Sequence, residues 1–198
     1  ISVYQLTIEP GTYFYRQGIQ GADETTGNEL YDCTQEVLGL AGLPAYEISN
    51  HAKLGFECSH NLIYWRGEDY LGIGPGAHGR LKKEVAGKLL GTEAIQEFRS
   101  PDKWLDAVRS KGGGTTKRNL LQFEERLEEL ILCGLRTTEG LDPERFYRIT
   151  GQRLFNHLKE EKLQRLIDGG FVVDSRSNLR LTENGLRCLD SVVKALLT

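Results

Sequence analysis

The segment from residue 46 to residue 80 constrains the fold of this chain more than any other part of it. It opens with YEIS at 46–49, where ring, charged, aliphatic and hydroxyl side chains alternate. That alternation predicts a strand buried on one face. A polar turn and the aromatic segment HNLIYW at 60–65 follow, and a second predicted strand at 70–74 runs into GPGAHG at 74–79. We expect functional residues here, because glycines after a strand let backbone amides come close to a ligand.

The first part of the chain has the pattern of an α/β fold. Residues 3–8 (VYQLTI) alternate at period two and predict a strand, whereas residues 29–41 carry apolar side chains at helical spacing. Gly42 and Pro44 stand where a helix ends. The order strand, helix, strand predicts a right-handed crossover between parallel strands.

The middle of the chain gives weaker signals. Residues 81–99 are charged and lack a clear period, so we interpret them as an excursion or linker. Pro101 opens a short predicted helix. Residues 111–118 hold three consecutive glycines with cationic flanks, a composition that supports no regular structure and predicts a domain boundary.

The last part of the chain has helical periodicity. Residues 123–135 place one apolar stripe on a predicted helix, formed by Phe123, Leu127, Leu130, Ile131 and Leu135. Asp142 and Pro143 predict the start of the next helix, and a further helix is expected over 153–167.

A two-stranded hairpin is expected over 171–173 and 179–181, around a turn at 175–178, and Thr182 caps the last predicted helix. Helix, hairpin, helix is the order of a winged helix. The second part is therefore predicted to be a small α+β domain.

Composition excludes several classes of protein. With 198 residues, 27% charged and 39% hydrophobic, the chain has the make-up of a soluble globular protein. Its net charge of -3 gives no bulk attraction to nucleic acid or to an anionic membrane. No apolar run approaches the roughly 20 residues that cross a bilayer. The first residue, Ile1, already lies in a strand-like run, which suggests a cut through a longer protein.

The four cysteines predict reduced thiols in a cytoplasmic protein. Cys33, Cys58, Cys133 and Cys188 have no compact metal-ligand spacing. Cys33 and Cys133 lie in amphipathic helical patterns, where a buried, reduced thiol is the common state.

His60 and Asn61 are the first candidates for a site, and two interpretations stay open. Both side chains could simply bond to backbone inside a turn, or His60 could bind a metal or haem, or position a planar substrate. Tyr64 and Trp65 could stack on a flat ligand, although rings on half-buried elements are usually core.

Two other motifs are weaker. GPGAHG formally matches the dinucleotide-binding GxGxxG, but Leu81-Lys82-Lys83 is a poor start for the helix that this motif requires. The wing-like hairpin raises nucleic acid as a rival ligand. Residues 142–198 are nearly balanced in charge, however, and a winged fold does not itself imply DNA binding.

Taken together, these motifs resemble the oxygen-independent coproporphyrinogen III oxidase-like proteins of the radical S-adenosylmethionine (radical SAM) superfamily, and within them the HemW-like branch, regarded as haem chaperones. The matching residues are SVYQLTIEPGT at 2–12, YEISN at 46–50, HNLIYW at 60–65 and the run 70–80. GLR at 134–136, EGL at 139–141 and LTENG at 181–185 look like the family's C-terminal domain.

The resemblance implies a fold and a division into domains. Residues 1–90 would be the C-terminal part of a partial (β/α) barrel, residues 91–118 a linker or excursion, and residues 119–198 a winged-helix-like C-terminal domain. The fold class expected is thus an α/β barrel fragment followed by an α+β domain. The family holds a four-iron–four-sulfur (4Fe-4S) cluster on a CxxxCxxC motif that this chain lacks, so we expect a C-terminal fragment without radical chemistry of its own.

The resemblance also implies site residues. S-adenosylmethionine (SAM) in the intact protein would lie near Gly72, Gly74, Gly76 and Ala77. The true oxidases carry an Arg-Asn-Phe-Gln-like stretch where this chain has HNLIYW, a departure that favours haem binding over decarboxylation. His60 would then be the haem-iron ligand, and Asn61, Tyr64 and Trp65 would lie against the macrocycle. Arg66 or Arg80 would pair with a propionate, or else form surface salt bridges.

Three functions therefore stay open: a fragment of a radical SAM haem chaperone, a fragment of a coproporphyrinogen III oxidase, and a winged-helix module that binds a protein or nucleic acid. The first is favoured. It implies haem or porphyrin as the ligand and a haem-recipient protein as a partner, with no nucleic acid and no membrane span.

Overall fold

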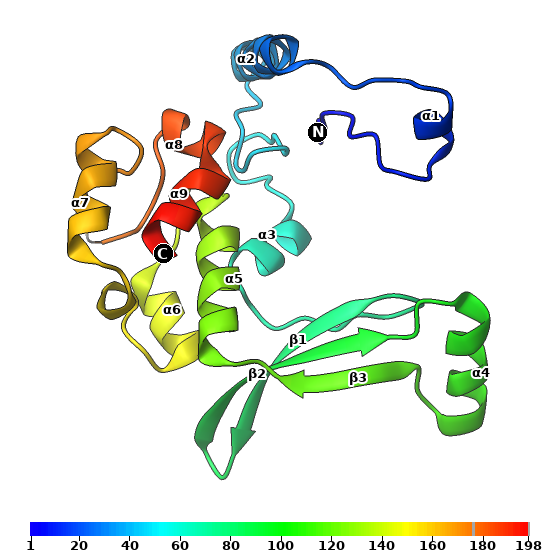
Figure 1. Ribbon diagram of the computed structural model, residues 1–198. Helices are drawn as coiled ribbons and strands as arrows, with labels where there is room; N and C mark the ends of the chain where they lie inside the picture. Colours follow the sequence, from blue (N-terminus) through cyan, green and yellow to red (C-terminus); the bar gives the residue numbers. More distant parts are fainter. Residues whose placement is uncertain (176, 198) are drawn as a thin grey trace. The chain divides into compact units, whose positions relative to one another are not determined.

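The computed structural model describes residues 1–175 and 177–197. The chain divides into two units, residues 1–58 and residues 59–198. The first unit contains α1 (Tyr13–Arg16) and α2 (Glu24–Leu40) (Figure 1). Asp23 caps α2 by accepting the Thr26 N–H at 2.8 Å, and this bond lowers the pKa of Asp23. The predicted helix is confirmed and starts earlier than expected, and Gly42, with φ of +74°, follows its end.

The strands expected in the first unit are not formed. Among the described residues, 3–8 and 46–49 contain no strand, and the isolated antiparallel bridge Ser2↔Asn50 lies beside them. The Val3 N–H donates to the Ser49 carbonyl at 2.8 Å. The parallel crossover and the barrel fragment are therefore not seen, because an extended segment becomes a strand only beside a neighbour that pairs with its backbone.

The first unit buries no large hydrophobic side chain among its described residues. Its buried residues are Gly27, Glu47, Asn50 and His51, while Leu40 and Phe56 are more than three-quarters exposed. Glu47 accepts hydrogen bonds from the Ser49 amide and the Asn50 side chain, so a polar turn stands where a core would be expected.

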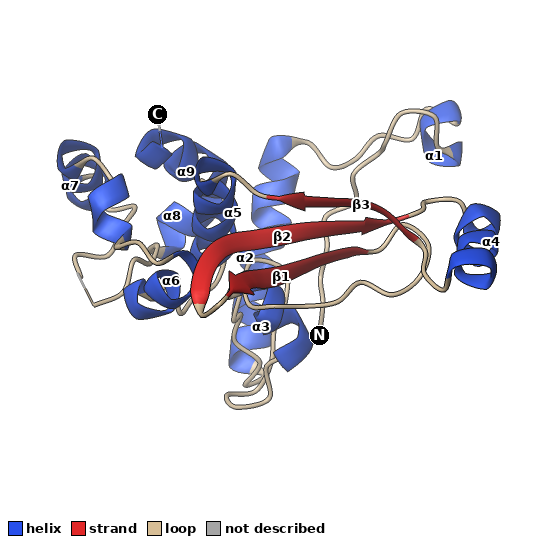
Figure 2. Cartoon of the chain, turned by 90° about the horizontal axis from the view of Figure 1, so that it is seen from below, coloured by secondary structure: helices blue, strands red, loops and turns tan. Residues whose placement is uncertain are grey.

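The second unit is built on a three-stranded antiparallel sheet in the order β1-β2-β3. Its elements before the helical cluster are α3 (Ser59–Trp65), β1 (His78–Val85), β2 (Lys88–Glu97), α4 (Pro101–Lys111) and β3 (Thr115–Leu120). Gly79 lies opposite Ile95 in β2, and Ile95 lies opposite Arg118 in β3. Helix α4 lies at one end of the sheet and the later helices lie at the other (Figures 1 and 2).

This sheet corrects the expectation for residues 81–99 and 111–118. The first segment forms most of the β1–β2 hairpin, and the second runs into β3. Periodicity misses these strands because charge pairs replace apolar alternation: Glu93, buried on β2, bonds to Lys83 and Arg118. Gly114 is not a loose linker residue either, since a Cβ there would come within 2.3 Å of the Trp104 ring.

The helical cluster contains α5 (Phe123–Leu135), α6 (Pro143–Thr150), a 3-10 turn η1 (Leu154–His157), α7 (Glu160–Asp168), α8 (Glu183–Arg187) and α9 (Leu189–Leu197). Its core holds Leu130, Ile131 and Leu135 of the predicted α5 stripe, together with Phe146 on α6. Helix α5 packs against α9 and α3. Asp142 caps α6 as expected, accepting the Glu144 N–H at 2.9 Å.

Two expectations in this cluster are corrected. The single helix expected over 153–167 is broken at Leu158, whose backbone is extended, into η1 and α7. The hairpin is reduced to the isolated antiparallel bridge Val172↔Leu181, and Leu179 pairs with Leu141 instead. Part of the expected turn, Arg176, lies outside the described residues. The winged helix is therefore not confirmed, and the observed class is a mixed α and β fold with a small antiparallel sheet.

Thr182 caps α8 through the Gly185 N–H at 3.1 Å as predicted, but the last helix is divided into α8 and α9. In the part of the chain that the structure describes, no helix is both long and apolar enough to span a bilayer.

The core of the second unit generates a first prediction. Phe146→Ala should lower the free energy of unfolding by about 3–5 kcal/mol, because the fully buried ring leaves a cavity. Tyr147→Ala, at a neighbouring side chain that is 50% exposed, should cost about 1 kcal/mol or less. Denaturant unfolding followed by circular dichroism measures both. Equal losses would show that Phe146 is not part of the core.

Candidate functional site

Helix α3 carries the HNLIYW motif and places His60 and Tyr64 one turn apart on one face. The His60 Nε2 atom lies 2.8 Å from the Tyr64 hydroxyl, and the two rings meet edge to face with centroids 4.9 Å apart. Tyr64 in turn meets Tyr70 edge to face at 4.6 Å. We call these three rings the ring file. Its outer member, His60, is exposed, whereas Tyr64 and Tyr70 are half-buried.

Trp65 and Asn61 are not members of the ring file. The guanidinium carbon of Arg136 lies 4.8 Å from the centre of the Trp65 ring, a cation–π contact. Asn61 is half-buried on the same helix. His60, Asn61, Tyr64 and Trp65 thus share one short helix, but only the rings of His60 and Tyr64 contact each other.

A cavity of about 260 Å³, here called the α3 pocket, lies in the second unit. The residues that line it include Tyr64, Trp65, Tyr70, Arg126, Glu129 and Cys133. Burial raises the pKa of the Tyr70 hydroxyl and of the Cys133 thiol, because both groups lose hydration of their charged forms.

Arg126 is the most buried charged group at this pocket, with 5% of the residue exposed. Its Nη1 atom donates to Glu129 at 2.9 Å, and its Nη2 atom donates to the Gly67 carbonyl at 2.5 Å. Glu129 also accepts from Arg80 Nε at 3.0 Å. Arg126 therefore joins Gly67, two residues after the end of α3, to α5, and Glu129 extends the network to Arg80 on β1.

Arg66 and Arg80, considered above as propionate partners, both form salt bridges within the chain. Arg66 makes a two-pronged contact with Glu139 at 2.8 Å, and Arg145 reaches the same carboxylate at 3.0 Å. These two guanidinium groups, chiefly through the Arg66 hydrogen bonds, lower the pKa of Glu139 despite its partial burial.

The strand expected at 70–74 is not formed, apart from the isolated bridge Tyr70↔Arg80. The glycine-rich segment 70–80, whose last three residues begin β1, is closed by its own backbone. Tyr70 and Arg80 exchange two hydrogen bonds, and a Cβ at Gly72 would come within 2.2 Å of the His78 carbonyl. The amides of Gly76 and Ala77 donate to the carbonyls of Phe98 and Gly74, so they are not available to a ligand. Gly74 takes a φ of +106°, which only glycine adopts readily. Glycine is thus required at position 72 by the close approach of the His78 backbone, without any ligand.

The cysteines and other potential ligands do not fit an iron–sulfur cluster. Within the described residues, no group of three or more His, Cys, Asp or Glu side chains could hold a metal ion. All four cysteines are unpaired thiols. Cys133 is partly buried, but Cys33 is exposed, which corrects the expectation of a buried thiol on α2. The described residues therefore provide no ligand set for a 4Fe-4S cluster.

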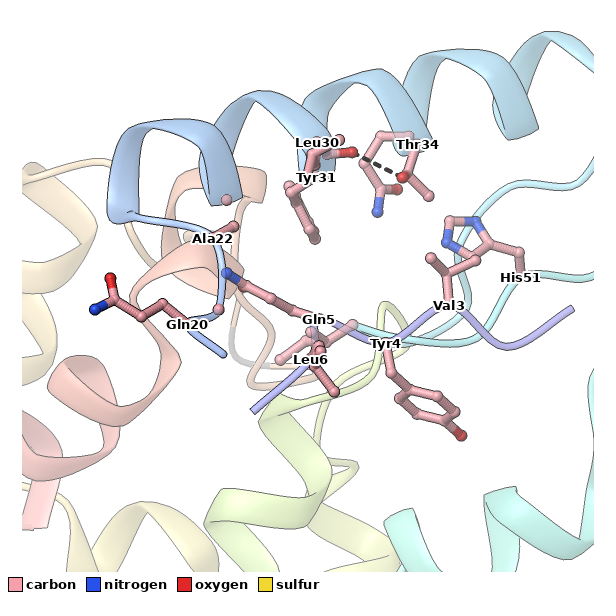
Figure 3. Close-up of a pocket in the computed structure, with 14 residues that line it drawn as sticks. Val3, Tyr4, Gln5, Leu6, Gln20, Ala22, Leu30, Tyr31, Thr34 and His51 are labelled. Atoms are coloured by element: carbon pink, nitrogen blue, oxygen red, sulfur yellow. Dashed lines mark hydrogen bonds between the residues drawn. The ribbon is translucent and has the colours of Figure 1, made fainter. Parts of the chain in front are cut away.

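A second cavity, of about 360 Å³, lies in the first unit between α2 and the segments near residues 3–6 and 48–51 (Figure 3). The residues that line it include Tyr4, Gln5, Leu30, Tyr31, Gln35 and His51, and no described lining residue is charged. His51 is only 2% exposed and its Nδ1 atom has no hydrogen-bond partner among the described residues. Sequence analysis pointed to none of these side chains as a group.

Three residues of α5 that complete the α3 pocket were not predicted from the sequence: Arg126, Glu129 and Cys133. One signal was present. Arg126 is spaced three residues from Phe123 and four from Leu130, so it falls beside the apolar stripe of α5, where an arginine indicates a buried charge with a partner.

Comparison with known proteins finds a family model and several relatives that match this chain. Residues 121–191 match the family described as the HemN C-terminal domain. The whole chain is 35% identical to the zebrafish (Danio rerio) "Radical S-adenosyl methionine domain-containing protein 1, mitochondrial", covering 46% of it. It is 34% identical, over 93% of its length, to "Heme chaperone HemW" of Bacillus subtilis, covering 47% of that protein. The Escherichia coli HemW is 29% identical and is covered to 49%.

The fold agrees with these matches. The structure of Escherichia coli coproporphyrinogen III oxidase (HemN), described as a radical SAM enzyme, matches the whole chain with a TM-score of 0.68 at 14% identity and is covered to 47%. The resemblance inferred from the motifs is therefore confirmed: the chain is related to radical SAM proteins of the HemN type. More particularly, it is a homologue of the HemW haem chaperones and corresponds to the C-terminal half of such a protein. It spans about half the length of the curated relatives it matches.

The Glu139 contacts generate a second prediction. Because the folded-state pKa of Glu139 lies below its ordinary 4.5, its ion pairs with Arg66 and Arg145 add stability above that pH. That contribution is lost as the pH falls through the lowered pKa. Glu139→Gln removes the titration, so its free energy of unfolding should fall less steeply below pH 4.5 than that of the unchanged protein.

The control is Glu128→Gln, at an exposed position on α5. Its profile from denaturant titrations at a series of pH values should run parallel to that of the unchanged protein. If Glu139→Gln also runs parallel, the salt bridges do not contribute to stability.

Proposed function

We propose that this chain is the C-terminal part of a radical SAM haem chaperone and that it binds haem, or a related porphyrin, on the face of α3. The observation that carries the proposal is the ring file: an exposed imidazole, His60, in line with two tyrosine rings. An imidazole suits haem iron, and aromatic rings suit the apolar plane of a porphyrin. The HemW names of the relatives support the same function.

The contact between His60 and Tyr64 assigns separate roles to the two imidazole nitrogens. A metal-bound histidine usually donates its other ring N–H to an oxygen, which fixes the tautomer. The Tyr64 hydroxyl lies 2.8 Å from Nε2 and can be that oxygen. In this proposal Nδ1 of His60 is the iron ligand, and Tyr64 holds the ring in place. Haem, when bound, supplies the iron centre and the flat macrocycle.

The size of the α3 pocket limits where the macrocycle can lie. Pockets that enclose a drug-sized ligand measure roughly 300–1,000 Å³, whereas this cavity is about 260 Å³. A macrocycle therefore cannot be enclosed there and would lie on the exposed side of His60 and Tyr64. Arg66 and Arg80 are already paired with glutamates, so they are weak candidates for its propionates.

We further propose that residues 1–90 belong to the barrel of the intact protein and residues 119–198 to its C-terminal domain, joined through 91–118. The first unit, residues 1–58, supports the barrel assignment for that part alone, because an apolar surface without a core needs neighbours to cover it. The boundary at residue 90 falls inside β2, so the division of the chain does not support it. The intact protein would carry the 4Fe-4S cluster and SAM. Gly72, Gly74, Gly76 and Ala77 remain the residues proposed for the SAM side, although two of their amides are already bonded.

The fold likeness to HemN favours a second candidate, part of a coproporphyrinogen III oxidase. Such a protein would bind the iron-free substrate rather than haem iron. The net charge of -3 does not favour a nucleic-acid-binding module. Two compartments are candidates for the protein. The cysteines predict a cytoplasmic protein, whereas the name of the zebrafish relative includes "mitochondrial".

A haem titration of the intact protein tests the proposal. Haem should give a saturable shift of its Soret band, and His60→Ala should weaken binding by at least about tenfold, which is 1.4 kcal/mol. Tyr64→Phe keeps the ring but removes the hydroxyl, and it should weaken binding by about tenfold or less, as expected for a group that supports a ligand.

The matched control is His78→Ala, another exposed histidine of the second unit, which should bind like the unchanged protein. Equal binding by His60→Ala and His78→Ala would remove His60 as the ligand. Tight binding of coproporphyrinogen without any haem binding would favour the oxidase instead.

A further inference from the structure

Two side chains that line the α3 pocket each carry a buried hydrogen-bond donor without an acceptor among the described residues. The donors are Nε1 of Trp65 and Nε of Arg126. Both side chains line the same cavity, and Arg126 is 5% exposed. Buried donors are nearly always satisfied in folded proteins, so a pair of them at one cavity calls for an acceptor that the chain does not supply.

The charge around the pocket favours an anion as that acceptor. Arg126 and Arg80 both bond to Glu129, so two guanidinium groups share one carboxylate and leave an excess positive charge. A neutral acceptor would satisfy the two donors but would leave this charge uncompensated in a partly buried site.

The size of the cavity selects among anions. About 260 Å³ is several times the share of one water molecule, which is about 30 Å³. It is too small for a macrocycle. Short carboxylates fit this range, and a carboxylate can accept from an indole N–H and a guanidinium N–H at the same time.

We propose that the α3 pocket binds a short carboxylate through Trp65 Nε1 and Arg126 Nε. The proposal rests on the proposed function in one respect: the carboxylate is then a propionate arm of the porphyrin that lies over His60. Tyr64 connects the two sites, because its hydroxyl contacts His60 while the residue lines the pocket. Trp65 thus acts as a hydrogen-bond donor to the ligand as well as a ring.

The first experiment tests the pocket without haem, on the unaltered intact protein. In ¹⁵N–¹H spectra, the indole peak of Trp65 is assigned by its disappearance in Trp65→Phe. Sodium propionate should move this peak downfield in a saturable manner, and propionamide, which is neutral and of similar shape, should not. The indole peak of Trp104 should stay in place, because its Nε1 already donates to Glu97 at 3.0 Å. A Trp65 peak that ignores propionate would overturn the proposal, and the cavity would then hold water.

The second experiment identifies the source of the carboxylate. The unaltered protein should bind haem more tightly than haem dimethyl ester, in which both propionates are blocked. Trp65→Phe should weaken haem binding by about tenfold, the loss expected for one hydrogen bond to a charged group, and should weaken binding of the ester by much less. Trp104→Phe, the control at the other tryptophan of this chain, should not distinguish the two ligands.

The outcomes separate this inference from the proposed function. If haem binds but acid and ester bind equally, the propionate assignment fails while the haem site stands. If haem does not bind but propionate moves the Trp65 peak, the proposed function fails and the pocket is a site for a free carboxylate. The comparison of acid and ester uses the unaltered protein, so it holds even if a Trp65 variant fails to fold.

Discussion

The position of the HNLIYW helix depends on one buried guanidinium, that of Arg126. It binds the Gly67 carbonyl just after α3 and the Glu129 carboxylate on its own helix, and Glu129 continues to Arg80 on β1. Removing one partner of a buried charge pair typically lowers the free energy of unfolding by about 3–5 kcal/mol, so we expect substitutions in this network to destabilise the second unit. Gly67 has no room for a side chain, because a Cβ would come within 2.1 Å of Leu130. The same guanidinium that fixes α3 also leaves its Nε unpaired at the pocket.

The two units differ in what holds them together. The second has a continuous apolar core on α5, α6 and α9, whereas the first has a buried polar turn around Glu47 and an uncharged cavity beside His51. Hydrophobic burial is the main favourable term in folding, so a unit without it depends on surfaces beyond its own. This contrast supports the proposal that residues 1–58 are part of a larger barrel. The ring file lies wholly within the second unit, which has its own core.

The amphipathic and capped helices were predictable from the sequence, because their signals are local. The α5 stripe and the Asp142 and Thr182 caps need only neighbours within a turn. The strands were not predictable in the same way. Residues 3–8 alternate correctly but lack a partner strand, whereas β2 does not alternate and still pairs on both sides. Strand formation depends on backbone partners far away in the chain, and Glu93 with its two cations replaced the apolar pattern.

For the site, the sequence by itself determined the candidate segment, the family resemblance, and the presence of His60, Tyr64 and Trp65 close together in the chain. The helix that carries these three residues, α3, was not predicted and is decided by the structure. Only the tertiary structure decided that His60 is exposed in a ring file and that Trp65 lies at a pocket with Arg126, some sixty residues later in the chain. It also decided that the glycines at 72–79 close their own loop. The physical reason is the distance along the chain between the residues that interact. Motif spacing reports which side chains share a helix, whereas burial and charge pairing depend on segments that only the folded chain brings together.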